Sequence, residues 1–345
     1  MRLKKLVVLG TLTAALLTAC QSNNTETQEQ TTAGGQEQAA ENTENASDDT
    51  SWPERTIEMV VPLKAGGDTD FYARTYAKYL EKELGQTITI INMEGAGGTV
   101  GAQSVIDADN DGYRILFYHT GNLYTNKMLG TTDIDQNSFD VSCVGVIDDT
   151  NVLVARKNLG VTDGKDFLEK AKAEPGKYSC ATTISGFSYF TLCKLEEAGG
   201  FEVNPVDSGG ASAMIPALLG DQVDLAVNSY GVFKQYVDNG DLVPLVLMDD
   251  ERNPQFPDVP TATELGIEGA SSERAYFFAF PKGTDPAIVK KLSDAVGKVQ
   301  ENPEYVKDIA DAYCVEPSYI PYESVGEYMD EMWNEMEPFT EALTQ

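Results

Sequence analysis

The sequence is short of positive charge and has almost no histidine. Its 345 residues include 25 Lys and Arg against 55 Asp and Glu, which gives a formal net charge of −30, and a single histidine, His119. A chain this acidic repels nucleic acid and anionic lipid headgroups, so we expect no nucleic-acid partner. One imidazole leaves almost nothing for His-rich metal sites or catalytic His pairs, and we expect no metal and no cofactor.

The apolar run near the N-terminus is too short to cross a bilayer. "MRLKK" is followed by about a dozen apolar residues and then by "LTAC", which ends at Cys20. This order is typical of a secretory signal peptide. The "LTAC" ending resembles a lipobox, which implies export, cleavage before Cys20 and lipid attachment to its thiol, so residues 1–20 are expected to be a lipoprotein signal peptide. The alternative is an uncleaved, buried helix.

Residues 21–51 contain no aromatic residue, no Val, Ile or Leu, and no basic residue. Such a segment has too little apolar surface to fold, and we expect a disordered, acidic tether. The lipid then anchors the protein to the outer face of the cytoplasmic membrane, and the tether sets the reach of the folded part.

The remaining cysteines, Cys143, Cys180, Cys193 and Cys314, fit no zinc spacing. Their even number in an exported chain permits disulfides. Cys193 falls in a helical pattern and Cys143 in an apolar strand, which favours buried free thiols instead.

Motifs for nucleotide or acyl chemistry are missing. "EGAGGTVG" from Glu94 follows a strand pattern, but a dinucleotide fingerprint beginning at Gly95 requires Gly or Ala where Val100 stands. No glycine run is followed by the Lys of a P-loop, and no Gly-x-Ser-x-Gly elbow occurs. We therefore expect that the protein is not an enzyme.

From Trp52 onward, strand and helix patterns alternate, which favours α/β sheets flanked by helices. Strands are expected at 56–63, 87–93, 113–118, 151–157, 177–183, 201–206, 223–229 and 242–248. Helices are expected at 68–84, 97–108, 163–173, 188–198, 211–219, 232–239, 285–300, from 303, and at 322–343. In the last helix, Met329, Trp333, Met336 and Phe339 share one face, which we expect to pack on the fold rather than to bind a partner.

The order of several segments along the chain resembles one family. Residues 53–117, 209–227, 257–267 and 278–292 closely resemble the Bug proteins, the solute receptors of tripartite tricarboxylate transporters, and the resemblance extends over 52–345. It implies a two-lobed type II periplasmic-binding-protein fold with two mixed or parallel sheets. Lobe one is then 52–150 and 254–345, lobe two is 151–253, and hinge strands near Asn151 and Leu247 let the lobes close on a small solute.

The resemblance places one half of the ligand site in the loop "VVPLKAGGDTD". There the family holds a ligand carboxylate through backbone amides and water, and a helix N-terminus offers free N–H groups and partial positive charge. The alternative is a plain turn capped by one of the aspartates. Lys64 either adds a positive charge to the site or is a solvated cation. The predicted residues are Lys64, Ala65, Gly66, Gly67, Asp68 and Thr69.

The other half is expected in lobe two, at the helix that opens with "TISGFSYF". Here Ser188-Tyr189 stands where the family usually has Ser-His, so an aromatic ring with a hydroxyl replaces the imidazole. Gly209 and Gly210 head the next helix and either contact the ligand or only start that helix. The predicted residues are Ser185, Gly186, Phe187, Ser188, Tyr189, Gly209 and Gly210.

Further candidates lie at strand ends, where open parallel sheets bind their ligands. Asn228 ends one strand of lobe two, and His119 and Thr120 end one of lobe one. For His119, the alternative is a structural hydrogen bond.

The resemblance implies a monomeric, lipid-anchored receptor that delivers a small organic acid to the permease subunits of a tripartite tricarboxylate transporter. Two alternatives remain, a sensory binding protein that signals to a membrane receptor and an extracellular enzyme on the same fold. The sequence does not select among dicarboxylates, tricarboxylates, amino acids and aromatic acids.

Overall fold

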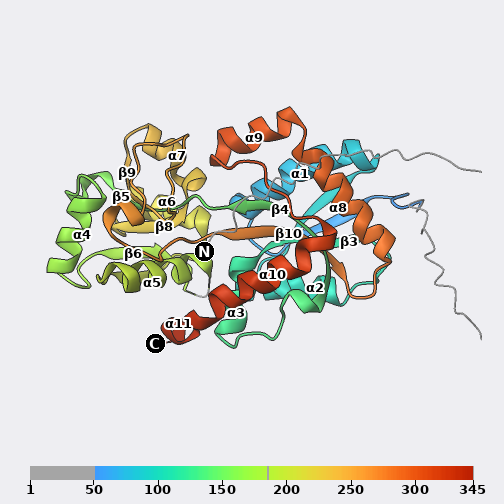
Figure 1. The fold of residues 1–345 in the computed structure, drawn as a ribbon, viewed down its shortest axis with the longest axis horizontal. Helices are drawn as coiled ribbons and strands as arrows, with labels where there is room; N and C mark the ends of the chain where they lie inside the picture. Colours follow the sequence, from blue (N-terminus) through green and yellow to red (C-terminus); the bar gives the residue numbers. More distant parts are fainter. Residues whose placement is uncertain (1–50, 185, 345) are drawn as a thin grey trace, which may run out of the picture. The chain divides into compact units, whose positions relative to one another are not determined.

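The computed structural model describes residues 51–184 and 186–344. The predicted signal peptide with Cys20, almost all of the tether, and Ser185 lie outside these residues. The described residues belong to one unit, which is built on two five-stranded sheets (Figure 1).

The first sheet is mixed, with the strand order β2-β1-β3-β10-β4. Strand β1 is parallel to both β2 and β3, whereas β10 is antiparallel to β3 and β4. The strands are β1 (Ile57–Val61), β2 (Ile88–Asn92), β3 (Arg114–His119), β4 (Phe139–Asp148) and β10 (Arg274–Pro281).

The second sheet has the order β7-β6-β8-β5-β9. Strand β6 is parallel to β7 and β8, and β5 is antiparallel to β8 and β9. The strands are β5 (Asn151–Arg156), β6 (Ser179–Thr182), β7 (Asn204–Asp207), β8 (Leu225–Ser229) and β9 (Leu242–Leu247). The predicted lobe boundaries, 150/151 and 253/254, fall in the connections from β4 to β5 and from β9 to β10, and remain predictions.

Helices cover both sheets, as the alternating pattern predicts (Figure 1). With the first sheet go α1 (Asp68–Leu84), α2 (Thr99–Ile106), α3 (Thr120–Met128), α8 (Pro286–Gln300), α9 (Pro303–Tyr313) and α10 (Tyr322–Met336), whereas α11 (Thr340–Thr344) contacts α5. With the second go α4 (Gly164–Ala173), α5 (Phe187–Gly199), α6 (Ala211–Leu219) and α7 (Tyr230–Asp238). Short 3-10 turns are η1 (Ala96–Gly98), η2 (Gln136–Ser138), η3 (Lys157–Leu159), η4 (Thr263–Leu265) and η5 (Glu337–Phe339).

Strand β10 shows how the first sheet is buried on both faces. All eight of its residues are buried. Tyr276, Phe278 and Phe280 belong to one core cluster, with α1 and α8, whereas Phe277 belongs to the other, with α3 and α10. Successive side chains of a strand point to opposite faces, so this uninterrupted apolar run fits a central strand.

Local signals explain several helix ends. Gly85, with φ 70°, ends α1, where a left-handed residue is favourable for glycine. Helices α8 and α9 each begin with proline, and the side chains of Asp285 and Asn302 cap them.

Two expected helices differ in detail from the structure. The helix expected at 322–343 is interrupted after Met336 by η5, because Pro338 has no N–H to continue the ladder. The helix expected at 97–108 begins at Thr99, since Gly97 and Gly98 have φ of 63° and 108°. Helix α3 is not among the expected helices. The expectation that one face of the last helix packs on the fold agrees with the structure, because Met329 and Met336 of α10 are buried in the core.

The described cysteines are all free thiols, and Cys143, Cys180 and Cys314 are buried. Burial raises the pKa of Cys143 to about 12 and that of Cys314 to about 11. Such thiols are poor nucleophiles, so they fill core space.

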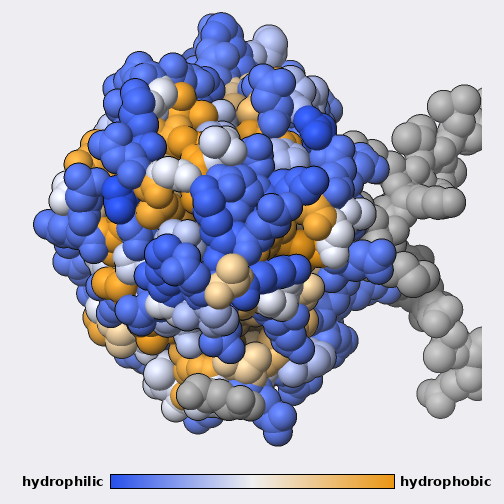
Figure 2. Space-filling model, turned by 90° about the vertical axis from the view of Figure 1, so that its left-hand side faces the viewer, coloured by the Kyte–Doolittle hydropathy of each residue, from blue (hydrophilic) through white to orange (hydrophobic). Residues whose placement is uncertain are grey.

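The surface agrees with the acidic composition. Hydrophilic residues cover most of the face shown in Figure 2, and hydrophobic ones appear between them in separate areas. Within 51–184 and 186–344, no helix is both long and apolar enough to cross a membrane, and no group of three or more His, Cys, Asp or Glu is arranged to hold a metal ion.

Candidate functional site

A buried arginine joins the two sheets. Arg274, the first residue of β10, is only 4% exposed. Its Nη2 lies 2.7 Å from Oδ2 of Asp68 and 3.5 Å from Oδ2 of Asp148. The same nitrogen donates to Oδ1 of Asn228 at 3.0 Å and to the hydroxyl of Ser229. We call these five residues the Arg274 cluster.

The cluster forms where elements of both sheets end. Asp68 begins α1 and Asp148 ends β4, both with the first sheet, whereas Asn228 and Ser229 close β8 of the second. Arg274 itself begins β10, just after the chain returns from the second sheet. The cluster therefore lies at the junction of the two halves.

Burial and charge set the protonation states at the cluster. Burial alone would raise the pKa of Asp68, but Arg274 and the Thr69 amide bring it below its usual range. Burial, and then the charge of Arg274, lower the pKa of His119 to about 3. At neutral pH the Asp68 carboxyl is therefore ionised and the imidazole is neutral.

Several buried polar groups near the cluster have no hydrogen-bond partner among the described residues. They include Nε of Arg274 and the hydroxyl of Tyr72, whose ring lies 4.8 Å from that of Tyr276. A buried donor without a partner costs free energy, so native proteins seldom leave one unpaired.

The predicted loop 65–69 contacts the Arg274 cluster because Asp68 belongs to both. The residues before Asp68 are more exposed than Asp68 itself. Lys64, Ala65 and Gly66 are exposed, which agrees with a solvated Lys64. The Gly66 amide donates to the Asp70 carboxylate at 3.0 Å. The alternative that an aspartate caps α1 is wrong, because Gly67 is the N-cap residue and no side chain caps it.

The two glycines of this loop differ. Gly66 has φ of 84°, a conformation that favours glycine, whereas Gly67 has φ of −90° and ψ of −179°, which any residue adopts. A Cβ on Gly67 would meet only the carbonyl of Lys64 at 3.6 Å. The fold thus requires glycine at position 66 but not at position 67.

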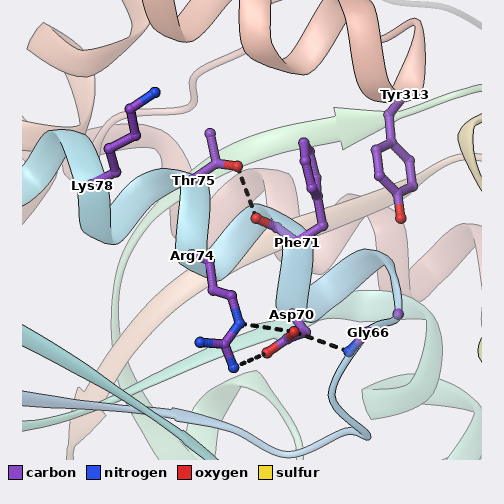
Figure 3. Close-up of a pocket in the computed structure, with 8 residues that line it drawn as sticks. Gly66, Asp70, Phe71, Arg74, Thr75, Lys78 and Tyr313 are labelled. Atoms are coloured by element: carbon purple, nitrogen blue, oxygen red, sulfur yellow. Dashed lines mark hydrogen bonds and ion pairs between the residues drawn. The ribbon is translucent and has the colours of Figure 1, made fainter.

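A cavity of about 430 Å³ opens next to the loop (Figure 3). Arg74 pairs with Asp70, one turn earlier on α1, at 2.9 Å (Figure 3). Lys78 pairs with Asp308 at 2.7 Å. Both cations are thus already paired, although half-exposed. The cavity is lined by Gly66, Gly67, Asp70, Phe71, Arg74, Thr75, Lys78 and Tyr313.

The second predicted segment reaches the cluster through Phe187. Its ring lies 5.5 Å from the Arg274 guanidinium carbon, and its amide donates to Oδ1 of Asn122 at 3.0 Å. The Gly186 amide donates to the carbonyl of Thr183 and the hydroxyl of Ser188 accepts from the Thr183 amide, so both groups shape the turn before α5.

Tyr189, which stands where the family has histidine, is half-buried. Burial, with Cys193 nearby, raises its pKa to about 12, so it is a neutral hydroxyl at physiological pH. Ser185 lies outside the described residues. Ligand contact by any residue of this segment remains a prediction.

Among the described residues, neither Gly209 nor Gly210 has a contact with the Arg274 cluster. Gly209 is exposed, and its amide donates to Asp207 at 3.1 Å. The two glycines have φ of 74° and 131°, with open space around the position of an added Cβ. This geometry agrees with the alternative that they start α6, and their ligand role stays a prediction.

His119 and Thr120 have structural partners. Nδ1 of His119, which is 2% exposed, accepts from the Asn122 amide at 3.2 Å and caps α3. The Thr120 hydroxyl accepts from the Ala275 amide at 3.1 Å, which ties α3 to β10. The structural alternative for His119 therefore agrees with its contacts, and ligand contact remains a prediction.

The glycine-rich segment after β2 has a packing role. The carbonyl of Gly97 accepts from the Tyr118 hydroxyl at 2.6 Å and from Nδ2 of Asn122 and Asn126 at 3.3 and 3.0 Å. A Cβ on Gly98 would overlap the Tyr118 ring. The glycines thus allow close contact with α3 and β3, which accounts for them without a nucleotide.

Sequence reasoning missed Arg274, Asp148 and Asn122. Arg274 had a recognisable signal, since it is a cation directly before an uninterrupted apolar run in a chain poor in cations. Asp148 and Asn122 had none, because their partners are distant in the sequence.

A profile described as "Tripartite tricarboxylate transporter family receptor" matches residues 72–344. The chain belongs to this family. This confirms the resemblance to the Bug receptors and the expectation of a solute-binding protein rather than an enzyme.

The family's curated members align over most of their length. The chain is 30% identical to a UPF0065 protein in the gbd 5' region of Cupriavidus necator, over 85% of this chain and 88% of that protein. It is 28% identical to protein BugT of Bordetella pertussis, over 82% and 87% of the two chains.

Solved structures of family receptors share the fold. The periplasmic binding protein BugD superposes with a TM-score of 0.74 at 27% identity, over 85% of this chain and 99% of that one. MatC of Rhodopseudomonas palustris, solved with bound malate, superposes with a TM-score of 0.73 at 26% identity, over 85% and 100%. The predicted two-sheet periplasmic-binding-protein fold is thereby confirmed.

Proposed function

We propose that the protein is an exported, lipid-anchored receptor that captures a small carboxylate and delivers it to the membrane subunits of a tripartite tricarboxylate transporter. Family membership over residues 72–344 is the observation that carries this proposal. The bound malate of MatC supports a carboxylate as ligand, and the periplasmic location of BugD supports export.

The proposed binding place is the junction of the two sheets. Arg274 supplies a buried cation there, and its unpaired Nε, with the Tyr72 hydroxyl, offers donors. The loops at 65–69 and 186–189 border this junction, and we propose that they contribute amides and hydroxyls to the ligand. The lobe limits 52–150 with 254–345, and 151–253, belong to the same proposal, as does a monomeric state.

Local donors must overcome the acidity of the whole chain. A net charge of −30 repels an anion at long range, but salt screens this beyond about 8 to 10 Å. Hydrogen bonds to charged groups contribute about 1.5 to 3 kcal/mol each, and micromolar binding requires about 8 kcal/mol. Four or five well-placed donors therefore suffice.

Two measurements test the proposal. Mass spectrometry of molecules released from the natively purified full chain should identify a small organic acid, and calorimetric titration of the emptied protein with that acid should show one site. Release of no such acid, together with no heat of binding for malate, succinate, citrate or L-aspartate, would contradict the proposal.

A further inference from the structure

Three short segments connect the two sheets and are hydrogen-bonded to one another. The first leads from β4 to β5, the second leaves β9, and the third enters β10. The amide of Met248 donates to the carbonyl of Asn151 at 2.8 Å, and the amide of Ser272 donates to the carbonyl of Met248 at 3.0 Å. Nδ2 of Asn151 donates to the carbonyl of Ser272 at 3.0 Å. The hinge segments, as we call them, are residues 148–151, 248–250 and 271–274.

Carboxylates from the second and third hinge segments act on Asp149 in the first. They are Asp249, which follows the end of β9 in the second sheet, and Glu273, which directly precedes β10 in the first. Asp249 is only 6% exposed and Asp149 is half-buried, so water screens their repulsion poorly. Each half of the protein thus brings one carboxylate to Asp149.

The surroundings of Asp149 oppose its ionisation. Burial, and then three neighbouring carboxylates, raise its pKa to about 7. These neighbours are Asp249, Asp148 and Glu273. Arg274, which lies 3.5 Å from Asp148, is already shared within the Arg274 cluster. Asp149 therefore changes its charge near neutral pH, whereas an ordinary aspartate does so near pH 4.

The elements packed on the third hinge segment add further charged and titratable groups. Nζ of Lys194, on α5, donates to the carbonyl of Ser271 at 2.5 Å, and the hydroxyl of Tyr328, on α10, donates to Glu273 at 3.2 Å. The carboxylates near the Lys194 ammonium group are Glu335, Asp250 and Glu273. Among these groups and those that face Asp149, carboxylates outnumber cations.

Separation of the halves would change this arrangement, because Asp249 moves with the second sheet and Glu273 with the first. Asp149 then loses a carboxylate neighbour and gains water, and its pKa falls toward the usual value of about 4. Between about pH 4 and pH 7, the protein with its halves in contact therefore holds a proton that the separated form does not. This contribution to contact is complete below about pH 4 and is lost as pH rises through 7.

We propose that the hinge is proton-linked: a proton on Asp149 favours the arrangement in which the two halves are in contact, and release of the proton favours their separation. The inference goes beyond the proposed function and rests on it in one respect, since solute capture requires that the halves move. Capture of a solute between the halves is then accompanied by proton uptake near neutral pH, and the protein retains its solute more firmly in acid.

Small-angle X-ray scattering of the ligand-free full chain, between about pH 5 and pH 8, tests the inference. We expect the radius of gyration to increase with pH, because the ratio of separated to contacting molecules rises about tenfold from pH 6 to pH 8. Asp149→Asn, which cannot ionise, should have the low-pH value throughout. Asp249→Asn, which removes one neighbouring charge, should move the transition to higher pH, since less of the separated form is then favoured at a given pH.

Glu196→Gln is the matched control. Burial raises the pKa of Glu196 to about 7 as well, but this carboxylate accepts from the amide of Val203 within the part built on the second sheet. We expect this variant to keep the pH dependence of the wild type. Loss of the dependence in Glu196→Gln would assign the transition to Glu196 and overturn the inference.

The remaining outcomes also decide the question. A wild-type radius of gyration that does not change with pH overturns the inference. The same holds if Asp149→Asn, folded by circular dichroism, keeps the wild-type dependence. If that variant does not fold, an unchanged transition in Asp249→Asn overturns it instead. No ligand is present in these measurements, so a negative result leaves the carboxylate receptor standing, and a failure to bind carboxylates would leave the scattering result intact.

Discussion

The side chain of Asn122 accepts a hydrogen bond from the backbone amide of Phe187 at 3.0 Å. Asn122 lies in the first turn of α3, which is tied to β10 of the first sheet, and Phe187 is the first residue of α5, which packs on β6 and β8 of the second. The amide of a first helical residue has no partner within its own helix, so Asn122 supplies one from the other half of the protein. Gly121 allows the contact, since a Cβ there would overlap the Phe187 ring.

Removing the hydrogen bond between Asn122 and the Phe187 amide should favour separation of the two halves of the protein, each built on one sheet. A hydrogen bond of this kind contributes about 1 kcal/mol, which changes the ratio of closed to open molecules about fivefold. We expect Asn122→Ala to increase the radius of gyration of the ligand-free chain in small-angle X-ray scattering, and saturating ligand to reverse the increase.

Asn126→Ala is the matched control for this measurement. Asn126 also donates to the carbonyl of Gly97, but its described contacts stay with the elements of the first sheet. Its radius of gyration should equal that of the wild type. Equal values for all three proteins, with and without ligand, would indicate a rigid protein.

Replacement of Arg274 should destabilise the fold strongly. Arg274→Met leaves Asp68 and Asp148 buried without their cation, and breaking a buried pair in this way costs about 3 to 5 kcal/mol. Urea unfolding followed by circular dichroism measures the change. Arg252→Met, which breaks an exposed pair with Glu264, should have a much smaller effect, and equal effects would show that the cluster contributes little.

Substitutions at the two loop glycines, Gly66 and Gly67, should have different effects on stability and on ligand affinity. Gly67→Val is compatible with the backbone and should change the free energy of unfolding by less than about 0.5 kcal/mol, but its side chain should exclude a ligand carboxylate from the loop. Two lost charge-assisted bonds weaken binding by about 3 to 6 kcal/mol. Gly66→Ala, in a left-handed conformation, should instead cost about 1 to 2 kcal/mol of stability. Native affinity in Gly67→Val would show that the loop is only a turn.

The single histidine should make stability depend on pH. Burial lowers the pKa of His119 to about 3, against about 6.5 in an unfolded chain. Between these values the unfolded chain binds a proton that the folded chain does not. The contribution of His119 to the free energy of unfolding is therefore complete above about pH 6.5 and is lost as pH falls toward 3. Because the two states differ by about one proton in this range, the slope approaches about 1.4 kcal/mol per pH unit.

His119→Asn keeps a cap acceptor without titrating, so its unfolding free energy should fall less steeply between pH 6.5 and 4. Burial raises the pKa of Asp149 and of Glu196 to about 7, and these groups act in the opposite direction, but they are present in both proteins and cancel in the comparison. The Hε1 resonance of the single imidazole should show no titration above pH 4. Titration near pH 6.5 would mean that the ring is exposed.

The proposed lipid anchor would be attached at Cys20. Cys20→Ser should leave the precursor uncleaved and without fatty acid, because Cys20 is the only thiol next to the signal-like segment. Metabolic labelling with radioactive palmitate, with Cys193→Ser as control, measures this. A processed and labelled Cys20→Ser would contradict the lipobox interpretation.

The fold was largely predictable because its signals are local. The glycine that ends α1, the prolines that begin α8 and α9, and the alternating apolar pattern each act within a few residues. Helix α3 was missed because its core-facing residues, such as Leu123 and Tyr124, are interspersed with Asn and Thr. Tertiary hydrogen bonds, including those of Asn126, satisfy these polar residues.

The site was less predictable, because its members meet only in three dimensions. The loop 65–69 could be named from its resemblance to the family, and Asp68 does lie in the cluster. The pairing of Asp68 with Arg274 joins residues 206 positions apart in the numbering, and no periodicity or motif encodes such a contact.

The short helix α11 touches the other half of the protein. Helix α11 contacts α5, and its Leu343 is buried in the same core cluster as Phe190 of α5 (Figure 1). Just before α11, the ring of Phe339 in η5 lies edge-on to that of Phe190, with 5.6 Å between the ring centroids. Because α11 contacts α5, which begins at Phe187, we expect a displacement of α5 on solute binding to reach Thr340–Thr344. A fluorophore attached near Thr344 would then act as a sensor of solute capture, whereas a bulky C-terminal fusion would hinder the motion it was meant to follow.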